Sequence, residues 1–86
     1  MNYETTFENG TKITPYLACA YIEGFCEGNN VSQIDIIKAY SNICGTKQYL
    51  SLQGFYGRNI KTLINNGILD ENGVVNWEIV DELLNN

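Results

Sequence analysis

Residues 51–75 constrain the fold of this 86-residue chain more than any other segment. The pair Asn66-Gly67 favours the end of a helix, and Asn72-Gly73 favours a tight turn between two short apolar segments. The pattern therefore predicts a helix followed by a small β-hairpin. The apolar positions that recur at helical spacing before the hairpin are Leu52, Tyr56, Ile60, Leu63 and Ile64.

The preceding chain predicts two further helices. Thr14-Pro15 is typical of an N-cap followed by a first helical residue, where proline needs no hydrogen-bond donor. Ser32 followed by Asp35 resembles a capping box. We expect the first helix to end at Gly28-Asn29-Asn30 and the second at Gly45, since these residue types tolerate a left-handed closing conformation. The inward apolar positions are Ala18, Cys19, Ile22, Phe25 and Cys26 in the first helix, and Ile36, Ile37, Tyr40, Ile43 and Cys44 in the second.

The remaining elements follow from local signals. Alternating apolar residues on either side of Asn9-Gly10 predict an N-terminal hairpin or arm over residues 1–13. Gly54 and Gly57 each disfavour a helix interior, so the third helix is expected to begin only near Gly57. Asn76 predicts the N-cap of a last helix that starts at Trp77. At 44% hydrophobic residues, the chain has enough apolar material for one core, and we expect a single domain over residues 1–86.

Charge is unevenly distributed along the chain. Residues 36–69 contain four basic residues and no acidic residue, whereas the remainder contains one lysine and all ten acidic residues. The central segment therefore carries +4 and the remainder −9. Such a distribution is compatible with a local anion-binding face, and equally with an ordinary solvated surface of uneven charge.

Cysteine spacing and hydropathy limit the classes of protein to which this chain can belong. Cys19, Cys26 and Cys44 are too unevenly spaced for a disulfide framework, and the chain has no histidine, so the sequence predicts neither a metal site nor a cofactor. We expect buried thiols in a reducing compartment.

No apolar run approaches the roughly 20 residues of a membrane span, and no signal peptide is evident. The chain is expected to be cytoplasmic, in a bacterial or infected host cell, without a membrane partner.

The residues do not indicate an enzyme. General acid–base catalysis needs a histidine or a perturbed carboxylate pair, and the pair Glu23 and Glu27 is expected to be solvated. No cysteine has a histidine to activate it, and neither a P-loop nor a dinucleotide fingerprint is present.

The order helix, helix, short connection, helix, hairpin over residues 14–75 resembles the winged helix-turn-helix family. The matching features are the cap at Ser32, Gly45 in the turn, the helix end at residues 63–67, and Ile68-Leu69 leading into the hairpin. The resemblance implies a mainly α fold with a small β part. It would consist of three core helices, a β-hairpin wing and a C-terminal helix at residues 76–86.

The same resemblance implies a small DNA-binding regulator of phage or mobile-element type, with the helix at residues 52–65 in the major groove. Arginine and lysine recognise guanine or phosphate, whereas asparagine and glutamine recognise adenine. A homodimer is a further expectation, because so short a chain gains stability by association. The candidate DNA-binding residues are Lys47, Gln53, Arg58, Asn59, Lys61 and Asn65.

A second hypothesis is an inhibitor or adaptor that binds a host protein or ribonucleoprotein. Asp70 and Glu71 at the tip of the predicted wing would repel phosphate, and six tyrosines are available for protein contacts. The short, acidic chain, rich in asparagine and tyrosine, is similar in size and general character to small phage-encoded inhibitors such as anti-CRISPR proteins. The candidate protein-binding residues are Tyr16, Glu23, Glu27, Asp70, Glu71, Glu78, Asp81 and Glu82.

Overall fold

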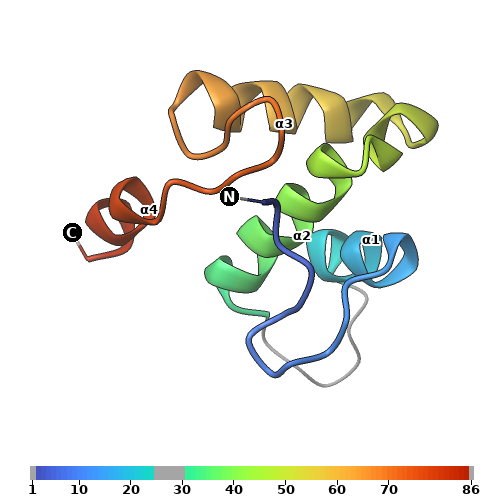
Figure 1. Cartoon of the computed structure of the whole chain (residues 1–86). Coiled ribbons are helices and arrows are strands. Elements are labelled where there is room, and N and C mark those ends of the chain that lie inside the picture. The colour runs from blue at the N-terminus through green and yellow to red at the C-terminus, as the bar shows by residue number, and fades with distance from the viewer. Residues whose placement is uncertain (1, 25–30, 86) are drawn as a thin grey trace.

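A computed structural model describes residues 2–24 and 31–85 of the chain. The described part contains four α-helices and one short 3₁₀-helix, joined by irregular segments (Figure 1). The elements are α1 (Pro15–Glu23), α2 (Gln33–Gly45), η1 (Gln48–Ser51), α3 (Gly54–Asn65) and α4 (Trp77–Leu84).

Side-chain caps begin three of the helices, as the sequence predicts. The Thr14 hydroxyl accepts a hydrogen bond from the backbone N–H of Leu17 at 3.2 Å, with Pro15 at the first helical position. The Ser32 hydroxyl accepts from the backbone N–H of Asp35 at 3.1 Å, and the Asn76 side chain accepts from that of Ile79 at 3.3 Å. These bonds satisfy donors that have no partner inside the helix. The predicted starts of α1, α2 and α4 are therefore confirmed.

The predicted start of the third helix is wrong, and the predicted end of the first cannot be compared with the described residues. α1 ends at Glu23, where Gly24 closes it in the left-handed conformation with φ of 78°. The predicted end at Gly28-Asn29-Asn30 lies outside the described residues, as do Phe25, Cys26 and Glu27. α3 begins at Gly54 and not near Gly57, so both glycines are helical. The Tyr49 ring of η1 packs over Gly57, and an added Cβ would lie in ordinary contact with that ring at 3.6 Å, so packing at this position does not require a glycine.

The predicted β-hairpin wing is also wrong, and with it the winged helix-turn-helix-like architecture. Among residues 2–24 and 31–85 there is no β-strand, and residues 68–76 form a loop with a single antiparallel bridge between Leu69 and Val75. Ile68 and Leu69 are consecutive, yet they are 8% and 3% exposed, so the segment packs into the core instead of projecting from it. In a strand with one solvated face, buried and exposed side chains alternate along the chain, and this segment lacks that alternation. The Asn76 N–H still donates to the Ile68 carbonyl at 2.9 Å, and α4 begins at the next residue.

The N-terminal residues form an arm that lies along α2. Its turn is closed by one bridge between Thr6 and Lys12 and by a hydrogen bond of 2.9 Å from the Phe7 N–H to the Thr11 carbonyl. Phe7 is 2% exposed and stacks on the Tyr21 ring of α1, with 3.8 Å between ring centroids. The arm is therefore held by its side chains in the core more than by strand pairing.

Two polar residues of α2 connect the arm and the loop at residues 68–76 to the helices. The Ser41 hydroxyl accepts from the backbone N–H of Glu4 at 2.8 Å and donates to the Gly73 carbonyl at 2.5 Å. The Asn42 amide donates to the Glu4 carbonyl at 2.9 Å. Both side chains are buried. The C-terminal half of α2 is thus covered by helices on one side and by these two irregular segments on the other.

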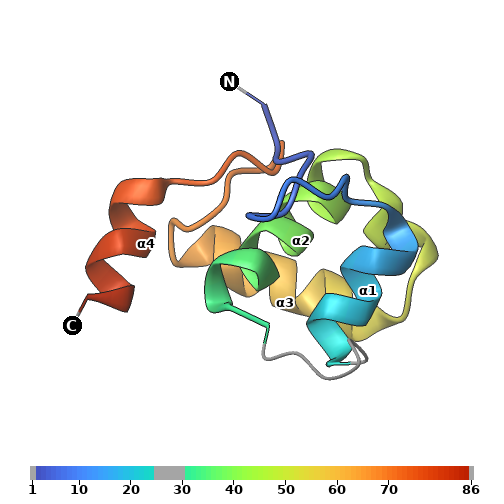
Figure 2. The same cartoon turned by 90° about the horizontal axis from the view of Figure 1, so that it is seen from below.

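α1, α2 and α3 form the main body, and α4 lies off to one side of it in both views (Figures 1 and 2). Val80 is 1% exposed and ties α4 to the core, where Phe7 and Ile43 are the other large, fully buried apolar side chains. The core therefore extends from the helical body to the base of α4.

Candidate functional site

The exposed face of α3 brings three of the predicted DNA-binding residues together. Arg58, Lys61 and Asn65 are spaced three and four apart, which places them on one side of the helix, and all three are exposed. α3 contains no acidic residue. The Arg58 guanidinium lies back over Gly54, where an added Cβ would be only 2.9 Å from one of its terminal nitrogens. The glycine therefore leaves room for the arginine on the helix surface.

A hollow of about 520 Å³ lies beside this face, and we call it the basic hollow. Its apolar floor is formed largely by α3, with Gly57, Ile60 and Ile64. Lys47 and Lys61 provide two cations, and Glu71 provides one carboxylate. The remaining lining residues are Cys44, Tyr49 and Asn65. The basic hollow can therefore accept a group that is apolar on one side and anionic on the other.

Lys47 reaches the basic hollow from the turn between α2 and η1. It has a φ of 64° and its ammonium group donates to the Glu71 backbone carbonyl at 3.0 Å. This bond uses one of three donors and leaves the charge unneutralised. Cys44 lies at the edge of the same hollow, where burial raises the pKa of its thiol although Lys47 opposes that shift. A thiol with a raised pKa is a poor nucleophile at neutral pH.

Two other predicted DNA-binding residues lie elsewhere on α3. Gln53 is the exposed N-cap and makes no capping bond with its side chain. The Asn59 amide donates to the Tyr40 hydroxyl at 2.8 Å, so it connects α3 to α2. A side chain committed to that bond is not free to contact a base without breaking it. The structure thus groups Lys47, Lys61 and Asn65 around the basic hollow and places Asn59 apart from them.

One cation of the central segment is committed to structural contacts. Within the described ranges, the ion pair of Lys38 with Glu4 at 3.4 Å is the only salt bridge. Lys38 also lies 5.9 Å from the centre of the Trp77 ring. Lys38 therefore belongs to the contacts between α2, the arm and α4, and the other basic residues of the central segment remain available to an anion.

The predicted protein-binding residues are dispersed. Tyr16 is 80% exposed, whereas the other five tyrosines are buried or partly buried. The Glu23 carboxylate accepts a hydrogen bond from the Tyr56 hydroxyl, so it connects α1 to α3. Asp70 accepts from the backbone N–H groups of Asn72 and Val74 at 2.8 and 3.0 Å and stabilises its own turn. The acidic residues exposed on α4 are Glu78, Asp81 and Glu82.

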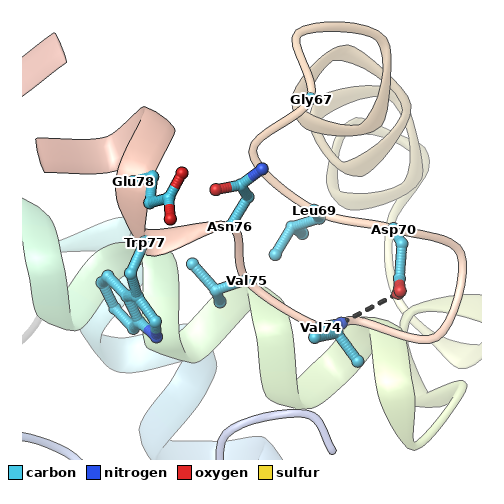
Figure 3. Close-up of a pocket in the computed structure, with 8 residues that line it drawn as sticks. All are labelled: Gly67, Leu69, Asp70, Val74, Val75, Asn76, Trp77 and Glu78. Atoms are coloured by element: carbon cyan, nitrogen blue, oxygen red, sulfur yellow. Dashed lines mark hydrogen bonds between the residues drawn. The ribbon is translucent and has the colours of Figure 1, made fainter. Parts of the chain in front are cut away.

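A second hollow of about 680 Å³ lies between the loop at residues 67–76 and the start of α4 (Figure 3). Leu69, Val75 and Trp77 supply its apolar surface, and Asp70 and Glu78 supply two carboxylates. No cation lines it. No sequence pattern predicts this hollow, because it depends on how the loop folds back beside α4, which no local pattern encodes.

Neither hollow has the chemistry of a metal centre. Cys19 and Cys44 are free thiols, and no group of three potential ligands among histidine, cysteine, aspartate and glutamate gathers within residues 2–24 and 31–85. None of the helices described for this chain is both long and apolar enough to cross a bilayer. Comparison with protein-family models, with curated proteins and with solved structures finds no match for this chain.

Proposed function

We propose that this chain is a small non-enzymatic regulator that binds DNA through the exposed face of α3. One observation carries the proposal: Arg58 and Lys61 share an exposed helix face that contains no acidic residue, and Lys47 adds a third cation across the basic hollow. Positive charge concentrated on one helix is the feature that phosphate binding requires. Asn65 on the same face can donate to and accept from a base edge.

The acidic net charge of −5 opposes binding at long range, and this opposition weakens as salt rises. Eight of the ten acidic residues precede residue 36 or follow Glu71. Glu71 itself lies at the basic hollow, so the phosphate backbone is expected to contact Arg58 and Lys61 and to avoid the loop that carries Asp70 and Glu71.

Fluorescence anisotropy with a labelled, mixed-sequence duplex at about 20 mM salt tests this proposal. We expect wild-type protein to bind with a dissociation constant of about 1–100 µM, in the range of non-specific DNA association. Arg58→Ala/Lys61→Ala should weaken binding at least tenfold. It should also reduce the slope of log affinity against log salt by about 2, because each removed cation neutralises one phosphate.

Lys12→Ala is the matched control, because it removes an exposed cation from the N-terminal arm and not from α3. It should change the affinity less than about twofold if charge position matters more than total charge. The proposal fails if wild type does not bind at low salt, or if the double variant and Lys12→Ala bind equally well.

A second function, that of an inhibitor or adaptor for a host protein or ribonucleoprotein, is favoured by α4. This helix exposes Leu83 and Leu84, which are 56% and 39% exposed, beside three carboxylates. Exposed apolar residues next to charge are typical of contact surfaces. The hypothesis predicts that a captured partner is lost after charge reversal at Glu78, Asp81 and Glu82 and released by about 0.5 M salt, where the screening length is on the order of 4 Å. Retention unaffected by either change would refute docking through this acidic surface.

A further inference from the structure

The apolar face of α4 continues beyond the part of the molecule that covers it. At 100° per residue, Ile79, Val80, Leu83 and Leu84 lie on one side of the helix. Val80 is 1% exposed and Ile79 packs against the core, but Leu83 and Leu84 in the next turn are exposed. The end of α4 therefore presents two leucines that the described part of the chain leaves 56% and 39% exposed.

The charge of α4 restricts what can cover these leucines. Glu78, Asp81 and Glu82 give the helix three carboxylates, and it carries no basic residue. Pairing α4 with α4 of a second copy would bring six carboxylates together, which repulsion disfavours. A favourable partner surface must combine an apolar floor with positive charge.

The basic hollow has this combination. Ile60 and Ile64 form its floor, and Lys47 and Lys61 stand beside them. Among the described residues, Glu71 is the single carboxylate that lines it, and these residues give the hollow a net charge of +1. Arg58 adds a further cation on the adjoining face of α3. The apolar floor matches the two leucines, and the lysines match Asp81 and Glu82.

We infer that this chain associates with a second copy of itself, with the Leu83–Leu84 end of α4 from one molecule seated in the basic hollow of the other. The exchange is reciprocal, so each dimer contains two equivalent contacts, as a two-fold symmetric pair requires. Each contact pairs unlike surfaces, which avoids the repulsion of acidic α4 against acidic α4. The interface is small, and association is therefore expected to be weak and to depend on salt.

Charge exchange between two variants tests the pairing directly. Lys61→Glu places a carboxylate in the hollow, and Glu82→Lys places an ammonium group on α4, so each variant alone opposes like charges at both contacts. In an equimolar mixture, the hollow of one variant faces the helix of the other with the charges reversed, and the second contact is the wild-type one. The mixture should therefore associate where neither variant does.

Sedimentation equilibrium over about 10 µM to 1 mM protein at about 20 mM salt gives the readout. Wild type should rise from the monomer mass of 9.7 kDa toward twice that value. Lys61→Glu and Glu82→Lys should each associate at least tenfold more weakly, and their mixture should recover to within about threefold of wild type. Lys12→Glu, a charge reversal on the N-terminal arm, should leave association unchanged.

Leu83→Ser/Leu84→Ser tests the apolar part of the contact without changing charge. This variant should also associate at least tenfold more weakly. All substituted side chains are exposed, and circular dichroism of each variant establishes that it folds. A wild type that remains monomeric at about 1 mM, single variants that associate like wild type, or a mixture that fails to recover would each overturn the inference. The samples contain no DNA, so the readout does not depend on the proposed DNA binding, although DNA and α4 would compete for Lys47 and Lys61.

Discussion

Removal of the Ser41 hydroxyl is expected to destabilise the fold out of proportion to the size of the change. This side chain is fully buried and connects α2 to two irregular segments, through the Glu4 N–H at 2.8 Å and the Gly73 carbonyl at 2.5 Å. In Ser41→Ala both groups lose their partner, and the buried methyl group offers no replacement. Leaving a buried donor or acceptor unpaired costs about 1–3 kcal/mol.

The Gly73 carbonyl and the Glu4 N–H differ in burial, and this difference sets the expected loss in the free energy of unfolding. The bond to Gly73 is buried and that to Glu4 is partly buried, so water can partly replace the second. We expect a loss of about 2–4 kcal/mol in the free energy of unfolding, against about 5–15 kcal/mol for a typical domain and less for a short one. The variant should therefore retain little of its stability at physiological temperature.

Urea titration followed by circular dichroism and by Trp77 fluorescence measures this loss. With a slope of about 1 kcal/mol per molar urea for so small a domain, the midpoint should fall by about 2 M or more at unchanged slope. Ser51→Ala in η1 is the matched control, because Ser51 is exposed, and its midpoint should match that of wild type. If Ser41→Ala and Ser51→Ala unfold at the same urea concentration, the two hydrogen bonds do not stabilise the fold as we argue.

Three further predictions concern stability. Gly73→Ala should destabilise the protein more than Gly10→Ala by at least about 2 kcal/mol in thermal unfolding. Both glycines have a positive φ, 81° at Gly73 and 88° at Gly10. Of the two, only at Gly73 would an added Cβ meet the Ser41 carbonyl and lie 2.7 Å from the Gly45 backbone nitrogen. Equal losses would show that the loop moves freely away from α2. Burial, with the Cys19 thiol and the Glu23 carboxylate acting in the same direction, raises the pKa of the Tyr56 phenol. Folding therefore favours the neutral phenol, so the contribution of Tyr56 to stability should be constant below about pH 10 and be lost above it. The fall in stability between about pH 8 and about pH 10.5, measured as urea midpoints, should be smaller in Tyr56→Phe than in wild type; identical pH profiles would contradict this assignment. Asn59→Ala removes the hydrogen-bond partner of the partly buried Tyr40 hydroxyl and should lower the free energy of unfolding by about 1 kcal/mol in the same urea assay. Asn65→Ala, at an exposed position, should leave it almost unchanged. Equal losses in the two variants would show that the 2.8 Å bond does not contribute to stability.

The local chemistry of helix starts was predictable from the sequence. Thr14, Ser32 and Asn76 bond to backbone groups within three residues of themselves, so their capping role depends on few other parts of the chain. The exposed basic face of α3 was predictable for the same reason, since residues three and four apart on a helix always share a side.

Strand pairing was not predictable in this way. The turn at Asn72-Gly73 forms, and Gly73 has the expected positive φ, but the flanking residues pair at only one bridge. A turn signal specifies a reversal of direction and not the length of the ladder that follows it. Here Ile68 and Leu69 both pack into the core, and that burial competes successfully with an extended hairpin.

The sequence by itself determined where the three side-chain-capped helices begin, and it located the central segment of positive charge. Tertiary structure decided which surfaces remain free. Asn42 has a polar side chain on the side of α2 that helical periodicity assigns to solvent, yet it is buried and donates to the Glu4 carbonyl of the arm. Leu83 and Leu84 continue an apolar face that periodicity assigns to the core, yet in the described part of the chain they remain exposed. Periodicity gives the direction of a side chain relative to its own helix, and only the packing of distant segments decides whether another part of the chain covers that side chain.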